Sequence, residues 1–401
     1  MRSLVICLCA AILASAAQSD ADRIQADLTA RHLPFGTILD PISTEPGAPD
    51  IASYTRCGDS AIWTGHYLAA QSFRYAATRT PEALAEVHRT LDGLETLVRI
   101  TGTGLLARCA FPASSPYAAN IASEEKTHGL TAASLNGEQW QWIGNTSRDQ
   151  YSGVFFGLTV AWSLVQDPAA QQRIAALSTE ILDHLFGHAW TVVMPDGSPS
   201  TTFIHRPDQQ LSLLKLGRRV NPGRFEAPYK ALSSSVAWAV SIPIATEVRE
   251  PHDSYFKFNL DYIHFWNLLT SGDNTLIRSS YKRGYDLLRR STDDHGNAHF
   301  NMIDRAINGP NAARDSETRA LLEAWLTRSR RDYAVDLRGA LPACGDRACQ
   351  PIPVAQRVPT DFLWQRSPFQ LAGGGDGYVE SSGIDYLLPY WMARYYGVLA
   401  E

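Results

Sequence analysis

The chain has 401 residues and a net charge of −5, and 45% of its residues are hydrophobic and 10% aromatic. This composition excludes a disordered chain and is sufficient for a large apolar core. Lys and Arg form no cluster of the kind that nucleic-acid binding requires, so we predict no nucleic-acid partner.

The N-terminus has the pattern of a secretion signal. Arg2 precedes the apolar stretch Leu4–Ala14, and Ala14-Ser15-Ala16 offers a small-x-small cleavage site. The stretch is shorter than the roughly 18 residues that a spanning helix needs, and no later segment is long and apolar enough to span. We predict a signal peptide over 1–16 and a periplasmic or extracellular protein without stable membrane insertion.

Four cysteines remain after this segment: Cys57, Cys109, Cys344 and Cys349. An even number in an oxidising compartment predicts two disulfides. Cys344 and Cys349 are close in sequence and would close a small loop, which leaves Cys57 to pair with Cys109. A zinc site is the alternative, but the four contain only one close pair and no nearby His.

A pair of helices recurs along the chain. Each unit starts with an Asp followed by Ser or Gln, continues with a strongly aromatic helix and a more polar helix, and ends at a glycine turn. The starts are Asp59, Asp149 and Asp253, which are 90 and 104 residues apart. In chain order, we predict helices over 22–32, 60–78, 81–100, 148–165, 168–188, 209–216, 229–248, 254–269, 274–290, 316–325 and 390–399.

Alternation of an apolar helix with an amphipathic one is typical of a two-layered helical toroid. We therefore predict an all-α fold, an (α/α) toroid of about five to six helix hairpins in a single domain over 17–401. Strands should be limited to the turns and a hairpin around 193–204. Two long segments, 103–146 and 338–382, are expected to be loops at one rim.

The helix starts supply the first candidate site. In such a toroid Asp59, Asp149 and Asp253 lie on one rim, and paired carboxylates are what glycosidic bond cleavage needs. The alternative is that each Asp is a helix N-cap. For Asp149 this alternative is weaker, because Ser147 and Gln150 fit a capping box in its place.

Further candidates have both a functional and a structural interpretation. Glu380 precedes the last helix together with Asp385, which is the better candidate for a cap. His66 lies two turns inside the first aromatic helix, where a core role is the alternative, and His205 follows the second turn. The aromatic loop residues Trp140, Trp142 and Trp364 are candidates for stacking on a sugar. Arg148 and Tyr151, on either side of Asp149-Gln150, are further candidates for substrate binding.

No cofactor or metal ion is predicted. The glycine run at 373–377 lacks the Lys-Ser/Thr that a phosphate-binding loop requires. Asp293-Asp294-His295 with His299 resembles a metal cluster, but Asp-His-Gly-Asn is also ordinary turn chemistry, which we favour.

Taken together, the repeated helix pairs, the Trp-rich inner helices and the Asp at each inner-helix start resemble the six-hairpin, or (α/α)6, glycosidase class. Within it, Arg148-Asp149-Gln150-Tyr151 is loosely similar to Asp-containing segments of the unsaturated glucuronyl and rhamnogalacturonyl hydrolases. The resemblance covers 59–399 and implies a secreted glycoside hydrolase with a carbohydrate substrate and a carboxylate acid/base pair.

Two other functions are compatible with the same architecture. A polysaccharide lyase would use His252 or Tyr255 to remove a proton next to a uronate, while Arg148 or Asn259 neutralises the carboxylate. A non-catalytic glycan-binding or envelope protein would retain the toroid without turnover.

Overall fold

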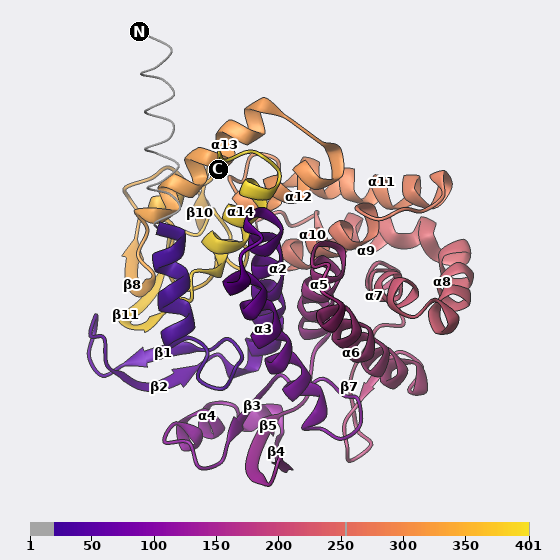
Figure 1. Cartoon of the computed structure of the whole chain (residues 1–401). Coiled ribbons are helices and arrows are strands. Elements are labelled where there is room, and N and C mark those ends of the chain that lie inside the picture. The colour runs from indigo at the N-terminus through magenta and orange to yellow at the C-terminus, as the bar shows by residue number, and fades with distance from the viewer. Residues whose placement is uncertain (1–19, 253–254, 401) are drawn as a thin grey trace.

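The computed structural model describes residues 20–252 and 255–400, which are mostly helical with small peripheral sheets (Figure 1). We had expected an all-α fold, but the small sheets show that the fold is not purely all-α. The predicted signal peptide and Asp253 lie outside the described residues.

Most helices occur as consecutive pairs in which the first member is the more buried. In α2, for example, every residue from Ser60 to Phe73 is buried, whereas α3 buries one stripe. The pairs are α2 (Ser60–Thr78) with α3 (Pro81–Arg99), α5 (Arg148–Leu164) with α6 (Pro168–Gly187), α7 (Pro207–Val220) with α8 (Pro222–Val236), α10 (Phe256–Leu269) with α11 (Thr275–Ser291), and α12 (Ala298–Asn308) with α13 (Ala312–Leu326).

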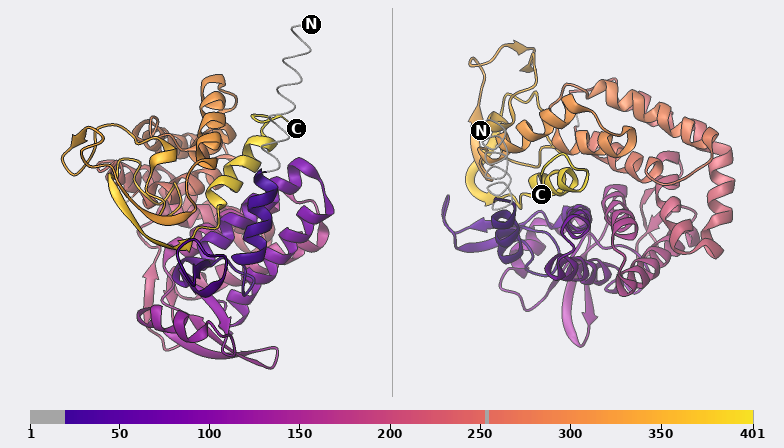
Figure 2. Two further views of the ribbon diagram at one scale, coloured as in Figure 1. Left: turned by 90° about the vertical axis from the view of Figure 1, so that its left-hand side faces the viewer. Right: turned by 45° about the horizontal axis from the view of Figure 1, so that its top comes forward.

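The buried helices contact one another in chain order. Helix α2 contacts α5, α5 contacts α7 and α10, α10 contacts α12, and α12 contacts the C-terminal helix α14 (Ile384–Tyr395), which returns to α2. Each amphipathic helix packs on the buried helix before it. The right-hand view of Figure 2 shows this course, with the chain passing around the molecule until its C-terminal helix lies beside the N-terminal part.

Helices α2 and α5 touch through glycines. A Cβ atom on Gly65 would lie 2.1 Å from the carbonyl oxygen of Gly153, and one on Gly157 would lie 2.2 Å from that of Gly65. Backbones this close admit no side chain between them. The contact therefore fixes the relative position of the two helix N-termini, where Asp59 and Asp149 lie.

The strands form small antiparallel sheets. One has the order β2-β1-β11-β8 and another the order β3-β5-β4, and β6 with β7 forms the hairpin predicted around 193–204. The strands are β1 (Asp40–Ser43), β2 (Ile51–Thr55), β3 (Cys109–Pro112), β4 (Leu130–Leu135), β5 (Glu138–Ile143), β6 (Thr191–Val193), β7 (Pro199–Thr202), β8 (Arg331–Asp336), β9 (Ala343–Cys344), β10 (Arg347–Ala348) and β11 (Ala372–Glu380).

Several expected boundaries were wrong. The two segments expected as loops contain β3 to β5 and β9 to β11. The predicted 229–248 helix is divided into the end of α8 and two short helices that follow it, η3 (Ala237–Val240) and α9 (Ser241–Glu247). Helix α12 was missed, because its start was taken as an extended turn, whereas Asn297 caps it by accepting from His299 N at 3.0 Å. The other short elements are η1 (Cys57–Asp59), α4 (Ala118–Glu124), η2 (Lys126–His128) and η4 (Val354–Gln356).

Both predicted disulfides, Cys57–Cys109 and Cys344–Cys349, are present. The first ties the start of α2 to β3, and the second closes the loop between β9 and β10. Within residues 20–252 and 255–400, no helix has the length and apolar character needed to cross a bilayer.

Candidate active site

Asp59 and Asp149 come together at the N-termini of α2 and α5. Gln150 connects the two helices, because its Nε2 donates to Asp59 Oδ1 at 3.1 Å and its Oε1 accepts from Ile62 N at 2.9 Å. Gln150 is fully buried, whereas both carboxylates are half-buried. The structure therefore brings together two of the three predicted rim aspartates, and Asp253 lies outside the described residues.

The geometry does not support the helix-cap alternative. Asp59 occupies the N-cap position of α2, but its side chain makes no capping hydrogen bond. Asp149 lies inside the first turn of α5, and the preceding Ser147 also makes no side-chain cap. The expected Ser147–Gln150 capping box is wrong, because the Gln150 amide is used across the helix interface instead of within its own helix.

The two carboxyl groups differ electrostatically. Burial raises the pKa of Asp59, and Arg108 and the hydrogen bond from Gln150 oppose this rise. Burial also raises the pKa of Asp149, and the charge of Asp59 raises it further, while Arg148 and Arg108 act against it. Like charges held close together cannot both ionise freely, so the pair loses its two protons in separate steps.

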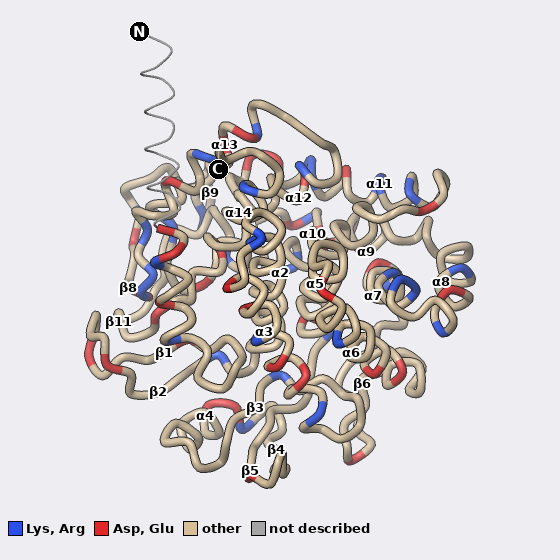
Figure 3. The backbone as a smooth tube through the Cα atoms, in the orientation of Figure 1, with Lys and Arg blue, Asp and Glu red and all other residues tan. Residues whose placement is uncertain are grey.

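Arg108 is the principal cation of this site. Its guanidinium donates to Gly58 O at 2.8 Å and to Asn145 O at 3.0 Å, which holds it beside both aspartates. Figure 3 shows acidic and basic residues interspersed along the chain. Arg148, predicted as a substrate ligand, donates to Thr202 O at 2.8 Å.

Sequence reasoning missed a third nearby carboxylate, Glu125. Its Oε1 accepts from Gly58 N at 2.7 Å, its Oε2 is 2.6 Å from His128 Nδ1, and its charge acts on Asp59. No local sequence signal marks it, because it comes from a segment that was taken as loop.

Glu380 is surrounded by arginine side chains. Its carboxylate forms ion pairs with Arg31 at 3.1 Å, Arg330 at 3.7 Å and Arg331 at 2.9 Å. Ion pairs with three guanidinium groups favour a structural role for this carboxylate over a catalytic one. Asp385 is not a helix cap, because it is buried in the first turn of α14 and accepts from Leu363 N at 3.0 Å.

His66 belongs to the buried interior. Its Nδ1 donates to Ile62 O at 2.9 Å, its Nε2 lies 3.1 Å from Asn259 Nδ2, and its ring stacks on Trp364 with centroids 5.3 Å apart. Burial lowers the pKa of His66 to about 4. Trp364, Trp142 and Tyr151 are also buried, so their core interpretation is favoured over sugar contact.

Two aromatic candidates remain accessible. Trp140, on β5, is half-buried and donates from Nε1 to Glu138 at 3.2 Å, and His205 is exposed. The residues considered for a lyase do not form a single group. Asn259 is hydrogen-bonded to His66 in the interior, and the side chain of Tyr255 is only 1% exposed.

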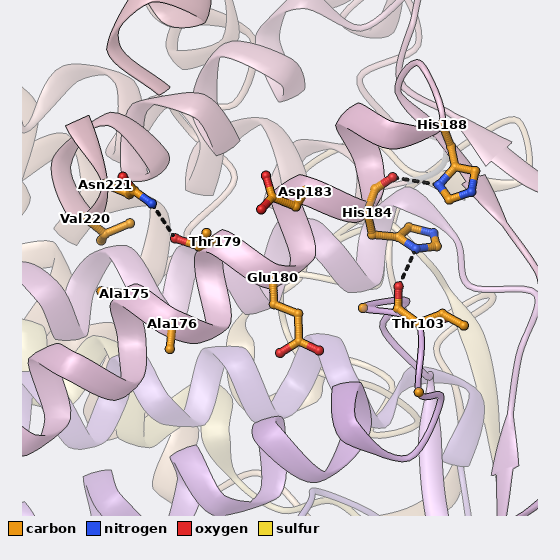
Figure 4. A pocket seen from close by; sticks show the side chains of 12 residues that line it. Thr103, Ala175, Ala176, Thr179, Glu180, Asp183, His184, His188, Val220 and Asn221 are labelled. Atoms are coloured by element: carbon orange, nitrogen blue, oxygen red, sulfur yellow. Dashed lines mark hydrogen bonds between the residues drawn. The ribbon is translucent and has the colours of Figure 1, made fainter. Parts of the chain in front are cut away.

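A groove of about 880 Å³ lies along α6, and neither Asp59 nor Asp149 lines it (Figure 4). His184 Nδ1 donates there to Thr103 O at 3.0 Å, and His188 Nδ1 donates to His184 O at 2.8 Å. None of the predicted site residues lines it, so its size alone assigns no chemistry. Among the described residues, no three His, Cys, Asp or Glu side chains form a group that could hold a metal ion.

Comparison of the sequence with protein families finds no match, and a search of curated proteins finds no similar sequence.

Proposed function

We propose that the protein is a secreted glycoside hydrolase of the six-hairpin class, with Asp59 and Asp149 as its acid/base pair. The observation that carries the proposal is the juxtaposition of two half-buried carboxyl groups on adjacent helix starts, neither of which caps its helix. The circular series of helix contacts supports the toroid, and the two disulfides support an oxidising compartment.

The two groups take different roles. Asp149 retains its proton and acts as the general acid that protonates the departing glycosidic oxygen. Asp59 ionises first and either activates a water molecule or attacks the anomeric carbon. Gln150 is a positioning residue, because its amide holds one oxygen of Asp59 and leaves the other for the reaction.

A panel of neutral and acidic oligosaccharides tests the reaction class. Hydrolysis produces new reducing ends without ultraviolet absorbance from a conjugated uronate, and this is the expected result. New reducing ends with that absorbance would identify a lyase, and binding without any turnover would identify a glycan-binding protein. Either of these two results contradicts the proposal.

A further inference from the structure

A smaller cavity of about 270 Å³ lies beside the loop that the Cys344–Cys349 disulfide closes. The rings of His252 and Phe369 form part of its wall, with centroids 4.3 Å apart and planes nearly perpendicular. Arg347 and Arg366 also line it. The cavity therefore combines two aromatic rings with two guanidinium groups.

Arg347 is unusual in its lack of partners. Its side chain is half-buried, yet among the described residues it has no hydrogen-bond or ion-pair partner. Several other half-buried arginines are neutralised by an ion pair: Arg31 by Glu380, Arg56 by Asp40 and Arg330 by Asp27. Partial burial of an unpaired cation is unfavourable, and an oxyanion that accepts from the guanidinium removes that cost.

The loop fixes the backbone at Arg347 before any ligand binds. The disulfide joins the two ends of the loop, and Arg347 pairs with Cys344 across the β9–β10 ladder. The next residue is anchored too, because Ala348 N donates to Phe369 O at 2.9 Å. The fixed backbone keeps the Arg347 side chain at the wall of the cavity, where its guanidinium can reach a bound ligand.

The cavity is connected to the proposed active site by charged contacts. Arg366 forms an ion pair with Asp361, and the other oxygen of Asp361 lies 2.9 Å from Arg56. The charge of Arg56 acts in turn on Asp59. Asp346 also lines the cavity but is exposed, and within the described part of the chain it forms no ion pair with Arg347.

We propose that this cavity binds an oxyanion carried by a sugar, either a carboxylate or a sulfate ester. Arg347 holds the oxyanion, the amide of Gln365 supplies a further donor, and the rings of His252 and Phe369 pack against the sugar. The role of the cavity as a substrate subsite rests on the proposed hydrolase function, whereas oxyanion binding does not.

Calorimetric titration tests the cavity with three probes: glucuronate, glucose 6-sulfate and neutral glucose. We expect Arg347→Met to weaken binding of the charged probe by roughly ten- to a hundredfold, as expected for loss of a charge-assisted hydrogen bond. Arg338→Met is the matched control, because this exposed arginine is paired with Asp336 and does not line the cavity. It should bind like the unaltered protein.

The outcomes separate the alternatives. Preference for glucuronate assigns a carboxylate, and preference for glucose 6-sulfate assigns a sulfate ester. The proposal is overturned if neither charged probe binds, if glucose binds as well as they do, or if Arg347→Met binds normally while its circular dichroism is unchanged. An Asp59→Asn/Asp149→Asn protein should retain binding, so failure of the hydrolase proposal is distinguishable from failure of this one.

Discussion

Replacing Gly65 by Ala tests the helix contact that positions the two aspartates. The new methyl group would lie 2.1 Å from Gly153 O, 2.3 Å from its carbonyl carbon and 2.6 Å from Val154 N. All three are backbone atoms, so no side chain can rotate away to relieve the clash. Helix α5 must therefore move away from α2.

The expected change in the free energy of unfolding is the sum of two opposing contributions. Overpacking at its upper range costs about 3 kcal/mol. The higher helix propensity of Ala stabilises the folded state by about 1 kcal/mol. We therefore expect Gly65→Ala to lower the free energy of unfolding by about 2 kcal/mol, and a shift of the helix starts by about 1 Å to reduce turnover by roughly 10²-fold.

Urea unfolding followed by circular dichroism measures the loss, with the slope of the transition checked for constancy. Gly187→Ala is the control, because this helical glycine at the end of α6 has no atom within 4 Å of an added Cβ. It should be neutral or slightly stabilising. An unfolding free energy for Gly65→Ala within about 0.5 kcal/mol of the unaltered protein would refute the packing argument.

Three further results are expected. Cys57 and Cys109 are 52 residues apart in the sequence. Replacing both by Ser should lower the free energy of unfolding in urea by about 4 kcal/mol, because the unfolded chain is no longer cross-linked. An unchanged free energy of unfolding would contradict a stabilising disulfide. The pKa of His66 is about 4 in the folded protein, against an ordinary value of 6.5. The stability that neutral His66 contributes is therefore complete above pH 6.5 and is lost as the pH falls toward 4. The total loss in unfolding free energy is about 3 kcal/mol. His66→Gln should flatten that acid limb, and an unchanged limb would exclude His66 as its cause. Burial raises the pKa of Asp149 in the folded protein, so the stability that its protonated form contributes is lost as the pH rises through that pKa. At neutral pH, Asp149→Asn should therefore melt no lower than the unaltered protein. A lower melting temperature would show that the charge of Asp149 stabilises the fold.

Helical periodicity predicted the elements that pack in the core. The bounds of α2 were predicted correctly, because an aromatic run begins at a clear break after Asp59, and α3 begins at Pro81 as expected. The strands in 103–146 were missed for a physical reason. Leu130–Leu135 alternates between exposed and half-buried positions and contributes to no large core, so its composition does not distinguish it from a loop.

The candidate site was only partly accessible from sequence. A repeated Asp at helix starts identified Asp59 and Asp149, but the roles of Glu125 and Arg108 depend on contacts between segments far apart in the chain. Glu380 was a candidate because of its position before the last helix, whereas its ion pairs with Arg31 and Arg330 come from long-range packing. Burial of Trp364 likewise depends on tertiary contacts that no local pattern encodes.

The most direct test of the carboxylate pair is a double-mutant cycle on the best glycan substrate. Asp59→Asn and Asp149→Asn should each reduce turnover by roughly 10²–10⁴-fold. The double variant should lose little more than either single one, because the two groups act as a unit. Asp183→Asn, on the groove side of α6, is the control and should be fully active. Full turnover in both single variants at the Asp59–Asp149 site would contradict the account.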